Sequence, residues 1–275
     1  MQQPRAPLRL TGTLVAQFFR FRCERQLRYD LVPEGERGPD VPRLNADPAA
    51  GPLVGPRPGS ELLMRAGRRW ERRKLDELLR RFGEDRVRVR GWTAGGEPLR
   101  LPYPETVAAL RDPGAYEFLV QPELRLPDPE GFARRWGIDP ALVRIAPAQP
   151  DLIRVHRRPD GTLRFRVIDI KASREATVAH YAQVAFYNVL LEEICRAEGI
   201  PGRPDRRWGA IWSRGTRGPK RFRLGAYRFH VEEFLRRDLP RIAALAPAEA
   251  AWHVDAASAG CPYFHHCRAE AERTD

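Results

Sequence analysis

A β-hairpin signal in the middle of the chain restricts the fold more than any other feature. Two runs rich in apolar and β-branched residues are separated by the tetrapeptide Arg-Pro-Asp-Gly, from Arg158 to Gly161. Pro-Asp-Gly between two such runs predicts a type I turn closed by a glycine in the left-handed region, which is the usual three-residue hairpin loop. We therefore expect Arg158 to pair with Thr162. In that register, residues whose numbers add up to 320 face each other across the two strands.

This register brings two carboxylates together. Asp151 precedes the first strand and lies opposite Asp169, near the end of the second. Directly opposed residues have Cβ atoms roughly 5 Å apart, close enough to share one metal ion. Lys171 follows two residues after Asp169, and alternation along a strand puts both side chains on one face. A two-residue loop would shift the register by one and turn the aspartates to opposite faces.

Two neighbouring carboxylates repel each other unless a proton or a cation lies between them. Mg²⁺ favours such a site, where one or two carboxylates, several waters and a substrate phosphate oxygen complete its shell. The alternative is a pair of exposed aspartates at the strand ends.

Lysine is rare in this chain. Of 48 basic residues, only Lys74, Lys171 and Lys220 are lysines. A lysine beside Asp169 supplies a compact ammonium with a shiftable pKa, which a planar and always protonated guanidinium cannot replace. The alternative is a lysine retained there by chance.

A third carboxylate lies on a helix predicted from Ser60, as N-cap, to Phe82. Apolar residues and a glycine recur along it at helical spacing: Leu63, Gly67, Leu75, Leu78 and Phe82. Glu71 falls on this stripe. A carboxylate on an apolar face is costly unless it is paired or metal-bound, so Glu71 is a candidate ligand. The alternative is a glutamate paired with a neighbouring cation, namely Arg68, Arg72 or Lys74.

These residues carry a family resemblance. Pro150-Asp151 is followed eighteen residues later by Asp169-Ile170-Lys171, and Gln183 and Tyr187 stand four apart on the next predicted helix. The order and spacing resemble the PD-(D/E)xK nuclease superfamily, in particular its RecB-like and Cas4-like branch, in which a Gln-x-x-x-Tyr motif follows the active-site strand. The resemblance implies a restriction-endonuclease-like core and a site that uses Mg²⁺ or Mn²⁺.

The resemblance also implies roles for individual residues. It assigns four metal ligands: Glu71, Asp151, Asp169 and the backbone carbonyl of Ile170. Lys171 would orient or activate the attacking water. Gln183 and Tyr187, one helical turn apart on one face, would contact DNA or brace the site; the alternative is ordinary helix packing.

Three of the four cysteines lie near the ends of the chain: Cys23, Cys261 and Cys267. They resemble the Cas4-like arrangement in which a [4Fe–4S] cluster clips the two ends together, but Ser258 replaces one expected cysteine. Four thiolates usually hold such a cluster. A vestigial clip, a three-cysteine cluster or a zinc site are therefore alternatives, and zinc could use one of three histidines: His253, His265 or His266. Cys195 is read as a core thiol.

The charge of the chain favours a polyanionic partner. Lysine and arginine outnumber aspartate and glutamate by 48 to 36, which gives a net charge of +12. Basic clusters occur at 68–73, 154–158 and 217–223, and Trp208, Trp212 and Tyr227 could stack on unpaired bases. The absence of a long apolar stretch or a signal peptide predicts a cytoplasmic protein without a membrane partner.

The expected organisation has four parts. Residues 1–32 form an N-terminal helix that carries Cys23, 33–60 a linker rich in proline and glycine, 61–250 the nuclease core, and 251–275 a Cys/His segment that packs back on the N-terminus. Strands are expected within 91–120 and 142–170 and at 208–213 and 221–229, and helices at 175–198 and 231–245. Strands flanked by helices predict an α/β fold with a mixed central sheet.

The sequence therefore predicts a metal-dependent DNA nuclease of repair, recombination or CRISPR adaptation that acts on single strands or DNA ends, with a helicase or a CRISPR integrase as a partner. The first alternative is a catalytically silent RecB-like subunit that binds DNA or a helicase. The second is a zinc or iron–sulfur interaction module that does not bind nucleic acid.

Overall fold

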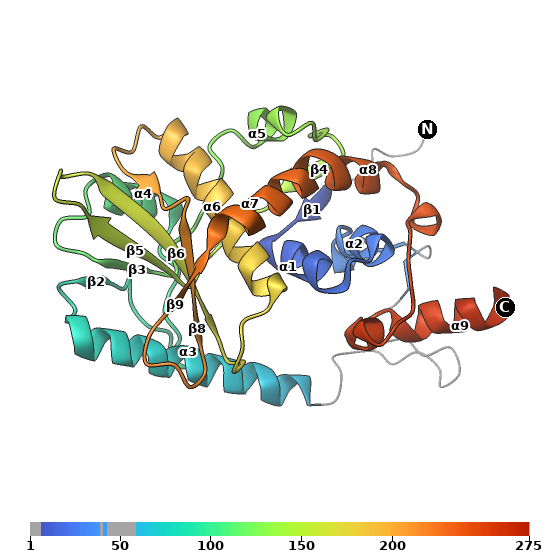
Figure 1. Ribbon diagram of the computed structural model, residues 1–275, viewed down its shortest axis with the longest axis horizontal. Helices are drawn as coiled ribbons and strands as arrows, with labels where there is room; N and C mark the ends of the chain where they lie inside the picture. Colours follow the sequence, from blue (N-terminus) through green and yellow to red (C-terminus); the bar gives the residue numbers. More distant parts are fainter. Residues whose placement is uncertain (1–6, 39–40, 43–58, 275) are drawn as a thin grey trace.

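The computed structural model describes residues 7–38, 41–42 and 59–274. Within them, a mixed sheet is flanked by helices on both faces, so the predicted α/β class with a mixed central sheet is confirmed (Figure 1). The linker predicted at 33–60 lies largely outside the described residues.

The N-terminal half alternates short strands with helices. Its elements are β1 (Leu8–Leu10), α1 (Gly12–Phe21), α2 (Glu24–Asp30), a 3-10 helix (Glu34–Glu36), α3 (Ser60–Phe82), β2 (Val87–Arg88), α4 (Tyr103–Arg111), β3 (Phe118–Val120), α5 (Pro129–Arg135) and β4 (Val143–Ile145).

The C-terminal half contains the longest strands. Its elements are β5 (Leu152–Arg157), β6 (Leu163–Lys171), α6 (Val178–Ala197), β7 (Arg203–Pro204), β8 (Trp208–Ser213), β9 (Lys220–Arg223), α7 (Leu224–Glu233), a π-helical turn (Phe234–Asp238), α8 (Leu239–Ala244), 3-10 helices (Pro247–Glu249 and Ala257–Gly260) and α9 (Phe264–Thr274).

The main sheet has seven strands in the order β2-β3-β5-β6-β8-β9, with β7 also paired to β6. The β5–β6 and β8–β9 pairs are antiparallel, whereas β6 and β8 run parallel with α6 between them in the chain. A separate two-stranded parallel sheet joins β1 to β4. Thus β6 lies at the centre of the main sheet, and its last residues reach one end of the sheet.

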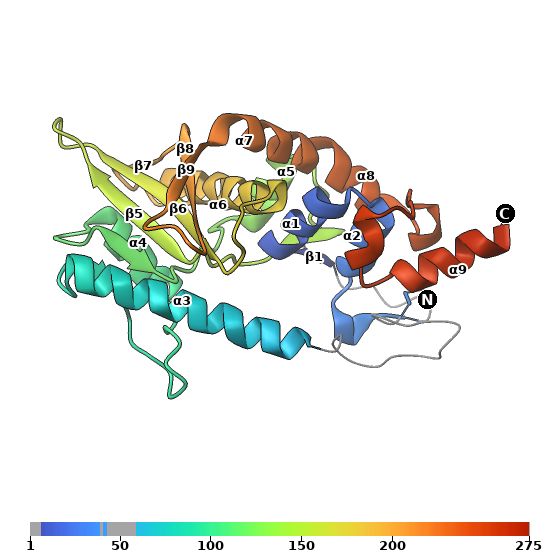
Figure 2. The same ribbon diagram turned by 60° about the horizontal axis from the view of Figure 1, so that its bottom comes forward.

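Two hydrophobic layers cover the sheet. On one face, Leu75 and Leu78 of α3 pack against side chains such as Ile168 and Ile170 of β6. On the other face, α1, α6 and α7 enclose a larger core that includes Phe165 and Val167. Alternate residues of β6 therefore belong to different layers, as expected for a strand buried on both sides. Figure 2 shows α3 on one side of the sheet and α6 and α7 on the other.

The predicted helix bounds at Ser60 and Phe82 are confirmed, but the N-cap prediction is wrong because Gly59 occupies that position. The strand predicted at 221–229 is also wrong beyond Arg223, where α7 begins. Leu224, Arg228 and Val231 are buried at spacings of four and three residues, so this segment has helical periodicity.

Other elements were not foreseen. A helix, α4, interrupts the region 91–120, and two prolines at its start favour a helical first turn over a strand. The segment 1–32, predicted as one helix, contains β1, α1 and α2 within its described part, and an αL residue at Arg22 separates the two helices. Residues of β1, α1 and α2 belong to the same hydrophobic core as α6.

Candidate active site

The β5–β6 hairpin has the predicted register. Leu152 pairs with Ile168 and Arg157 with Leu163, so paired residue numbers add up to 320. Arg158 N donates to Thr162 O at 3.0 Å. Gly161 closes the loop with φ of 78°, which is the left-handed conformation that glycine adopts without strain. The short-range turn signal therefore sets the relation between Asp151 and Asp169.

Asp151, Asp169 and Lys171 meet where this hairpin ends. The Nζ atom of Lys171 lies 2.8 Å from Oδ2 of Asp169. Asp151 turns its Oδ2 toward the backbone of β6 and accepts a hydrogen bond from Ile170 N at 2.6 Å. Asp169 is 3% exposed, and its Oδ2 has no well-directed hydrogen bond within the described residues. One ammonium therefore stands against a buried carboxylate, Asp169, and a partly buried one, Asp151.

Glu71 approaches Asp151, Asp169 and Lys171 from α3, which covers the other face of the sheet. The three cations that could have paired with it bind other acids instead: Arg68 binds Glu97, Arg72 binds Asp76, and Lys74 binds Glu77. The alternative interpretation of Glu71 as a paired surface glutamate is therefore wrong. We call Glu71, Asp151 and Asp169 the acidic cluster.

Gln121 connects two members of the acidic cluster. Its Nε2 donates to Glu71 Oε1 at 2.5 Å and to Asp151 Oδ1 at 3.3 Å, and Gln149 Nε2 donates to its Oε1 at 2.5 Å. Gln121 follows β3 with φ of 50°, an uncommon conformation for a residue other than glycine. No sequence signal indicated Gln121 or Gln149, because their places depend on how β3 pairs with a strand far along the chain.

Burial has the largest effect on the pKa values of the acidic cluster, and repulsion between its carboxylates adds to it. Burial raises the pKa of Asp151 well above its ordinary value, and Asp169 and Glu71 raise it further. Burial likewise raises the pKa of Glu71, although the hydrogen bond from Gln121 opposes this shift. Burial alone would lower the pKa of Lys171, but the neighbouring carboxylates raise it overall. The cluster therefore favours added positive charge, either protons or a cation.

A divalent metal ion fits the chemistry of these donors. Three carboxylates with one lysine leave negative charge in a partly buried place, and carboxylate oxygens are the ligands that a divalent ion such as Mg²⁺ takes. No three His, Cys, Asp or Glu side chains in the described part of the chain already converge as a metal site. The Gln121 amide stands between Glu71 and Asp151 and supplies partial positive charge there. Binding of an ion by both carboxylates would therefore require Gln121 to move.

Gln183 and Tyr187 lie on α6 behind the acidic cluster. Gln183 Nε2 donates to Tyr187 Oη at 2.9 Å, and both residues are less than 10% exposed. Burial, followed by Asp169 and Asp151, raises the pKa of Tyr187. A Cβ atom at Gly12 of α1 would lie only 2.3 Å from the Tyr187 ring, so α1 packs directly on this helix. These positions favour bracing of the site over direct contact with a nucleic acid by Tyr187.

A cavity of about 730 Å³ opens beside Lys171. Its walls come from α1 and the start of α6, and they include Gln17, Arg20, His180 and Gln183. His180 Nδ1 accepts a hydrogen bond from the backbone of Thr177, which is the N-cap of α6. Sequence reasoning missed the α1 side of this cavity, since nothing local to residues 12–21 indicates that they reach β6.

Lys74 is the second lysine with a specific environment. It is 7% exposed, and its Nζ lies 4.6 Å from the ring centroid of Trp70 and 4.9 Å from that of Trp212. It also donates to Thr216 O at 3.2 Å. These contacts hold α3 against the β8–β9 hairpin one turn from Glu71. Two of the three lysines thus lie at or near the acidic cluster, Lys74 buried and Lys171 partly buried.

The three cysteines near the chain ends are brought together. Cys23, Cys261 and Cys267 are each 6% exposed and share a hydrophobic cluster with Tyr29 and Tyr263. We call them the cysteine cluster. Burial raises the pKa of Cys261 to about 12 and also raises that of Cys267, although Arg25 opposes the latter shift. Neutral thiols are therefore the stable form in this apolar environment.

Ser258 does not complete a ligand set in this arrangement. Its hydroxyl donates to Asp255 O and accepts from Asp255 N, each at 2.8 Å. Of the three histidines considered as zinc ligands, His253 lies 3.7 Å from Asp255 and His266 lies 3.8 Å from Glu270. The donors present do not match the four thiolates of an iron–sulfur cluster.

The predicted basic clusters lie on different elements. Strand register places Arg154 opposite Arg166 on β5 and β6, and Arg221 and Arg223 of β9 lie over the Trp208 ring of β8. The cluster at 68–73 lies on α3. In contrast, Trp212 is only 3% exposed, so the prediction that it stacks on bases is wrong.

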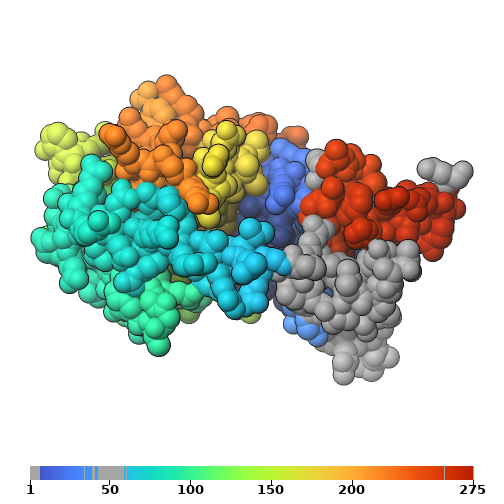
Figure 3. Space-filling model, turned by 90° about the horizontal axis from the view of Figure 1, so that it is seen from below, coloured from blue at the N-terminus to red at the C-terminus, as the bar shows by residue number. Residues whose placement is uncertain are grey.

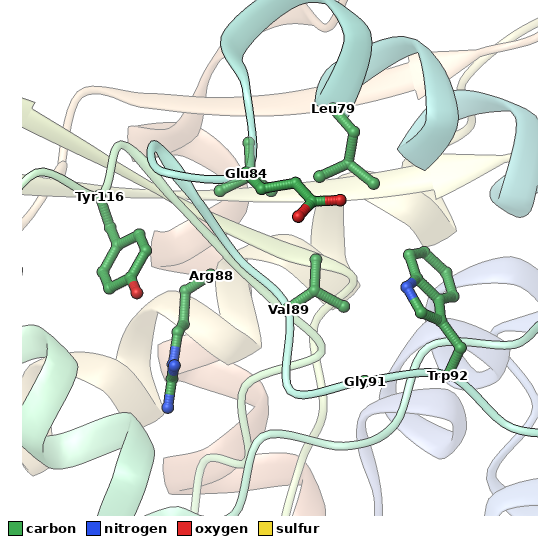
Figure 4. A pocket seen from close by; sticks show the side chains of 8 residues that line it. Leu79, Glu84, Arg88, Val89, Gly91, Trp92 and Tyr116 are labelled. Carbon is green, nitrogen blue, oxygen red and sulfur yellow. The ribbon is translucent and has the colours of Figure 1, made fainter.

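A smaller pocket, of about 190 Å³, lies under the C-terminal half of α3 (Figure 4). Leu79, Arg88, Trp92 and Tyr116 line it, and no member of the acidic cluster does.

No helix in the described residues is both long and apolar enough to cross a membrane. Comparison with models of known protein families and with curated proteins finds no match to this chain.

Proposed function

We propose that this chain is a metal-dependent nuclease with a restriction-endonuclease-like core, of the RecB-like and Cas4-like branch of the PD-(D/E)xK superfamily. The observation that carries the proposal is the contact between Lys171 and Asp169 in a buried cluster with Asp151 and Glu71. The sequence motif predicted these four residues, and they lie together although they come from three separate segments. The proposed substrate is DNA, at single strands or ends.

Phosphodiester hydrolysis needs an activated water and positive charge near the phosphate. A bound Mg²⁺ or Mn²⁺ would supply a water of lowered pKa and charge for the phosphate oxygens. Glu71, Asp151, Asp169 and the carbonyl of Ile170 would hold the ion. Lys171 would hold the attacking water by hydrogen bonding and share the charge that develops on the phosphate. Gln183 and Tyr187, joined by a hydrogen bond on α6, would brace the site behind these groups.

The roles require particular protonation states. Asp151 and Glu71 must lose their protons to bind a cation, and their raised pKa values make this harder at acidic pH. Lys171 keeps its proton, because the carboxylates raise its pKa. It is therefore a proton-bearing hydrogen-bond donor to the water or phosphate, and we do not assign it the role of general base.

A catalytically silent DNA-binding or helicase-associated subunit is the second candidate, and one observation favours it. The amide of Gln121 already bridges Glu71 and Asp151, so the cluster is partly neutralised without an ion. We include no iron–sulfur chemistry in the proposal, because Ser258 is engaged by Asp255 and only three thiols gather. A helicase or CRISPR integrase partner stays part of the proposed context in repair, recombination or CRISPR adaptation.

The test is cleavage of end-labelled single- and double-stranded DNA with Mg²⁺ or Mn²⁺, comparing the unmodified protein with Asp169→Ala and Lys171→Ala. We expect metal-dependent cutting that both substitutions abolish. Binding of DNA without cutting by the folded, metal-loaded protein would favour the silent subunit. Cutting that persists in both variants would show that the site lies elsewhere.

A further inference from the structure

An arginine-lined groove runs along α3 beside the acidic cluster. It has a volume of about 440 Å³ and lies between α3 and a short loop at 91–99. Five arginines of α3 line it, together with Gly95, Gly96 and Glu97 of the loop: Arg65, Arg68, Arg69, Arg72 and Arg73. We call it the arginine groove. Figure 3 views the molecule from the side on which α3 (cyan) crosses it.

Three of these arginines are engaged within the protein. The Arg72 guanidinium lies 3.8 Å from the ring centroid of Trp92, and Arg72 also donates to Gly96 O at 2.5 Å. It therefore fastens the loop to the helix. Arg68 binds Glu97 across the groove at 2.9 Å, and Arg65 binds Glu61 along the helix at 2.5 Å.

Arg69 and Arg73 differ from the other three. Both are exposed, and neither forms an ion pair with any residue that the structure describes. Four residues on a helix correspond to an axial rise of about 6 Å, and residues at this spacing project from the same side. Two free guanidinium groups are therefore presented at a separation comparable with that of successive phosphates on an extended strand.

The groove and the acidic cluster are neighbours. On α3, Glu71 is two residues from both Arg69 and Arg73, a spacing that turns its side chain to a different side of the helix. The connection to the groove is the loop, because Glu97 contributes to the raised pKa of Glu71 and also pairs with Arg68. Among the described residues that line the groove, Glu97 is the only carboxylate. A nucleic acid strand that passes from the acidic cluster to the outer side of α3 would reach Arg69 and Arg73.

We propose that the arginine groove binds the sugar–phosphate backbone of one nucleic acid strand next to the acidic cluster. Arg69 and Arg73 bind the phosphates, and the Glu97 carboxylate competes with the phosphates for Arg68. This inference rests on the proposed nuclease function and specifies where its substrate strand lies. The groove has a volume of about 440 Å³ and arginines on one wall, which matches one sugar–phosphate backbone, and we assign a single strand as its occupant.

The test measures binding separately from cleavage. A fluorescein-labelled oligothymidylate is titrated with the protein in EDTA at several salt concentrations, and fluorescence anisotropy gives the affinity. We expect the double variant Arg69→Gln/Arg73→Gln to bind roughly tenfold more weakly. Each phosphate contact on a single strand contributes about 0.7 to the slope of log affinity against log salt, so the slope should decrease by about 1.4.

The chain offers a matched control for the loss of two charges. Arg9 and Arg144 are exposed and face each other in the β1–β4 pair. The variant Arg9→Gln/Arg144→Gln should change affinity less than about threefold and leave the salt slope unchanged. Conversely, Glu97→Gln frees Arg68 and should tighten binding about threefold. A duplex of the same length should bind with little dependence on Arg69 and Arg73.

The outcomes separate this inference from the nuclease proposal. Equal weakening by both double variants, or no binding of the oligonucleotide by the unmodified protein, would overturn the groove assignment even if cleavage occurs. Binding that depends on Arg69 and Arg73 without any metal-dependent cutting would support the groove and reject the nuclease. A stronger effect on duplex than on single-stranded DNA would overturn the assignment of a single strand.

Discussion

The acidic cluster and the cysteine cluster both gather metal-binding residue types, but their electrostatic conditions differ. In the acidic cluster, three carboxylates face one ammonium, and the pKa values of Glu71 and Asp151 are raised by burial and mutual repulsion. In the cysteine cluster, the thiols of Cys261 and Cys267, whose pKa values burial also raises, lie among aromatic side chains. Neutral thiols need no counterion, whereas ionised carboxylates do. The difference predicts that an added cation stabilises the acidic cluster and not the cysteine cluster.

The largest expected effect comes from removing the ammonium of the acidic cluster. Lys171→Met should reduce metal-dependent DNA cleavage by about 10³-fold, because one preorganised donor near the reacting phosphate contributes on this scale. The measurement is the initial cleavage rate of labelled DNA, with circular dichroism to verify folding.

Lys220 on β9 provides the matched lysine control for this experiment. Lys220→Met removes the same charge from an exposed position and should leave the cleavage rate within about threefold. Cys261→Ala should likewise cut DNA at a near-normal rate if the cysteine cluster is structural. Equal losses of cleavage rate in Lys171→Met and Cys261→Ala would contradict the distinction between the two clusters.

Substitution in the cysteine cluster should lower the stability of the fold, although it leaves the cleavage rate nearly unchanged. Cys261→Ala leaves a small cavity among Tyr263, Cys23 and their neighbours, which should lower the free energy of unfolding by about 1–2 kcal/mol in urea titrations. Prolonged treatment with a strong chelator should change the melting temperature of the unmodified protein no more than it changes that of Cys261→Ala. A chelator-induced decrease that Cys261→Ala abolishes would show that a metal holds the chain ends together.

Metal affinity should depend on pH at the acidic cluster. Glu71 and Asp151 bind protons more tightly in the fold than ordinary carboxyls do, so protons compete with Mn²⁺ at a higher pH. Affinity measured by calorimetry should be constant at alkaline pH and fall as pH decreases through values above 4.5, the ordinary pKa of glutamate. A midpoint at or below 4.5 would contradict the raised pKa values.

A smaller effect concerns metal-free stability. Glu71→Gln retains an acceptor for Gln121 Nε2 and removes one negative charge. It should increase the free energy of unfolding by about 1 kcal/mol at pH 8 without metal, since one pKa unit corresponds to about 1.4 kcal/mol. The sign of this change in the free energy of unfolding follows from the raised pKa of Glu71. Above that pKa the ionised carboxylate destabilises the fold, so its removal stabilises the protein. This gain in stability vanishes as pH falls below that pKa. The lower limit is reached below the ordinary pKa of 4.5, so urea titrations at pH 8 and pH 4 measure both limits, and an equal gain at both would reject the charge of Glu71 as the cause.

The parts of the site that local sequence determines were predictable. The Pro-Asp-Gly turn sets the β5–β6 register, and helical spacing from Ser60 to Phe82 sets the position of Glu71. Gln121 was not predictable, because its place depends on pairing between β3 and β5 and on a left-handed backbone conformation. The contribution of α1 was also missed, since the close packing of Gly12 on Tyr187 joins segments about 175 residues apart in the chain.

The most direct test of the central claim is the effect of Mn²⁺ on thermal stability, because it probes the acidic cluster without requiring cleavage. Binding to the folded state alone raises stability in proportion to the logarithm of ligand concentration over the dissociation constant. We predict that Mn²⁺ raises the melting temperature of the unmodified protein and of Cys261→Ala, but not that of Asp169→Asn. No shift in the unmodified protein, or an equal shift in Asp169→Asn, would contradict the account.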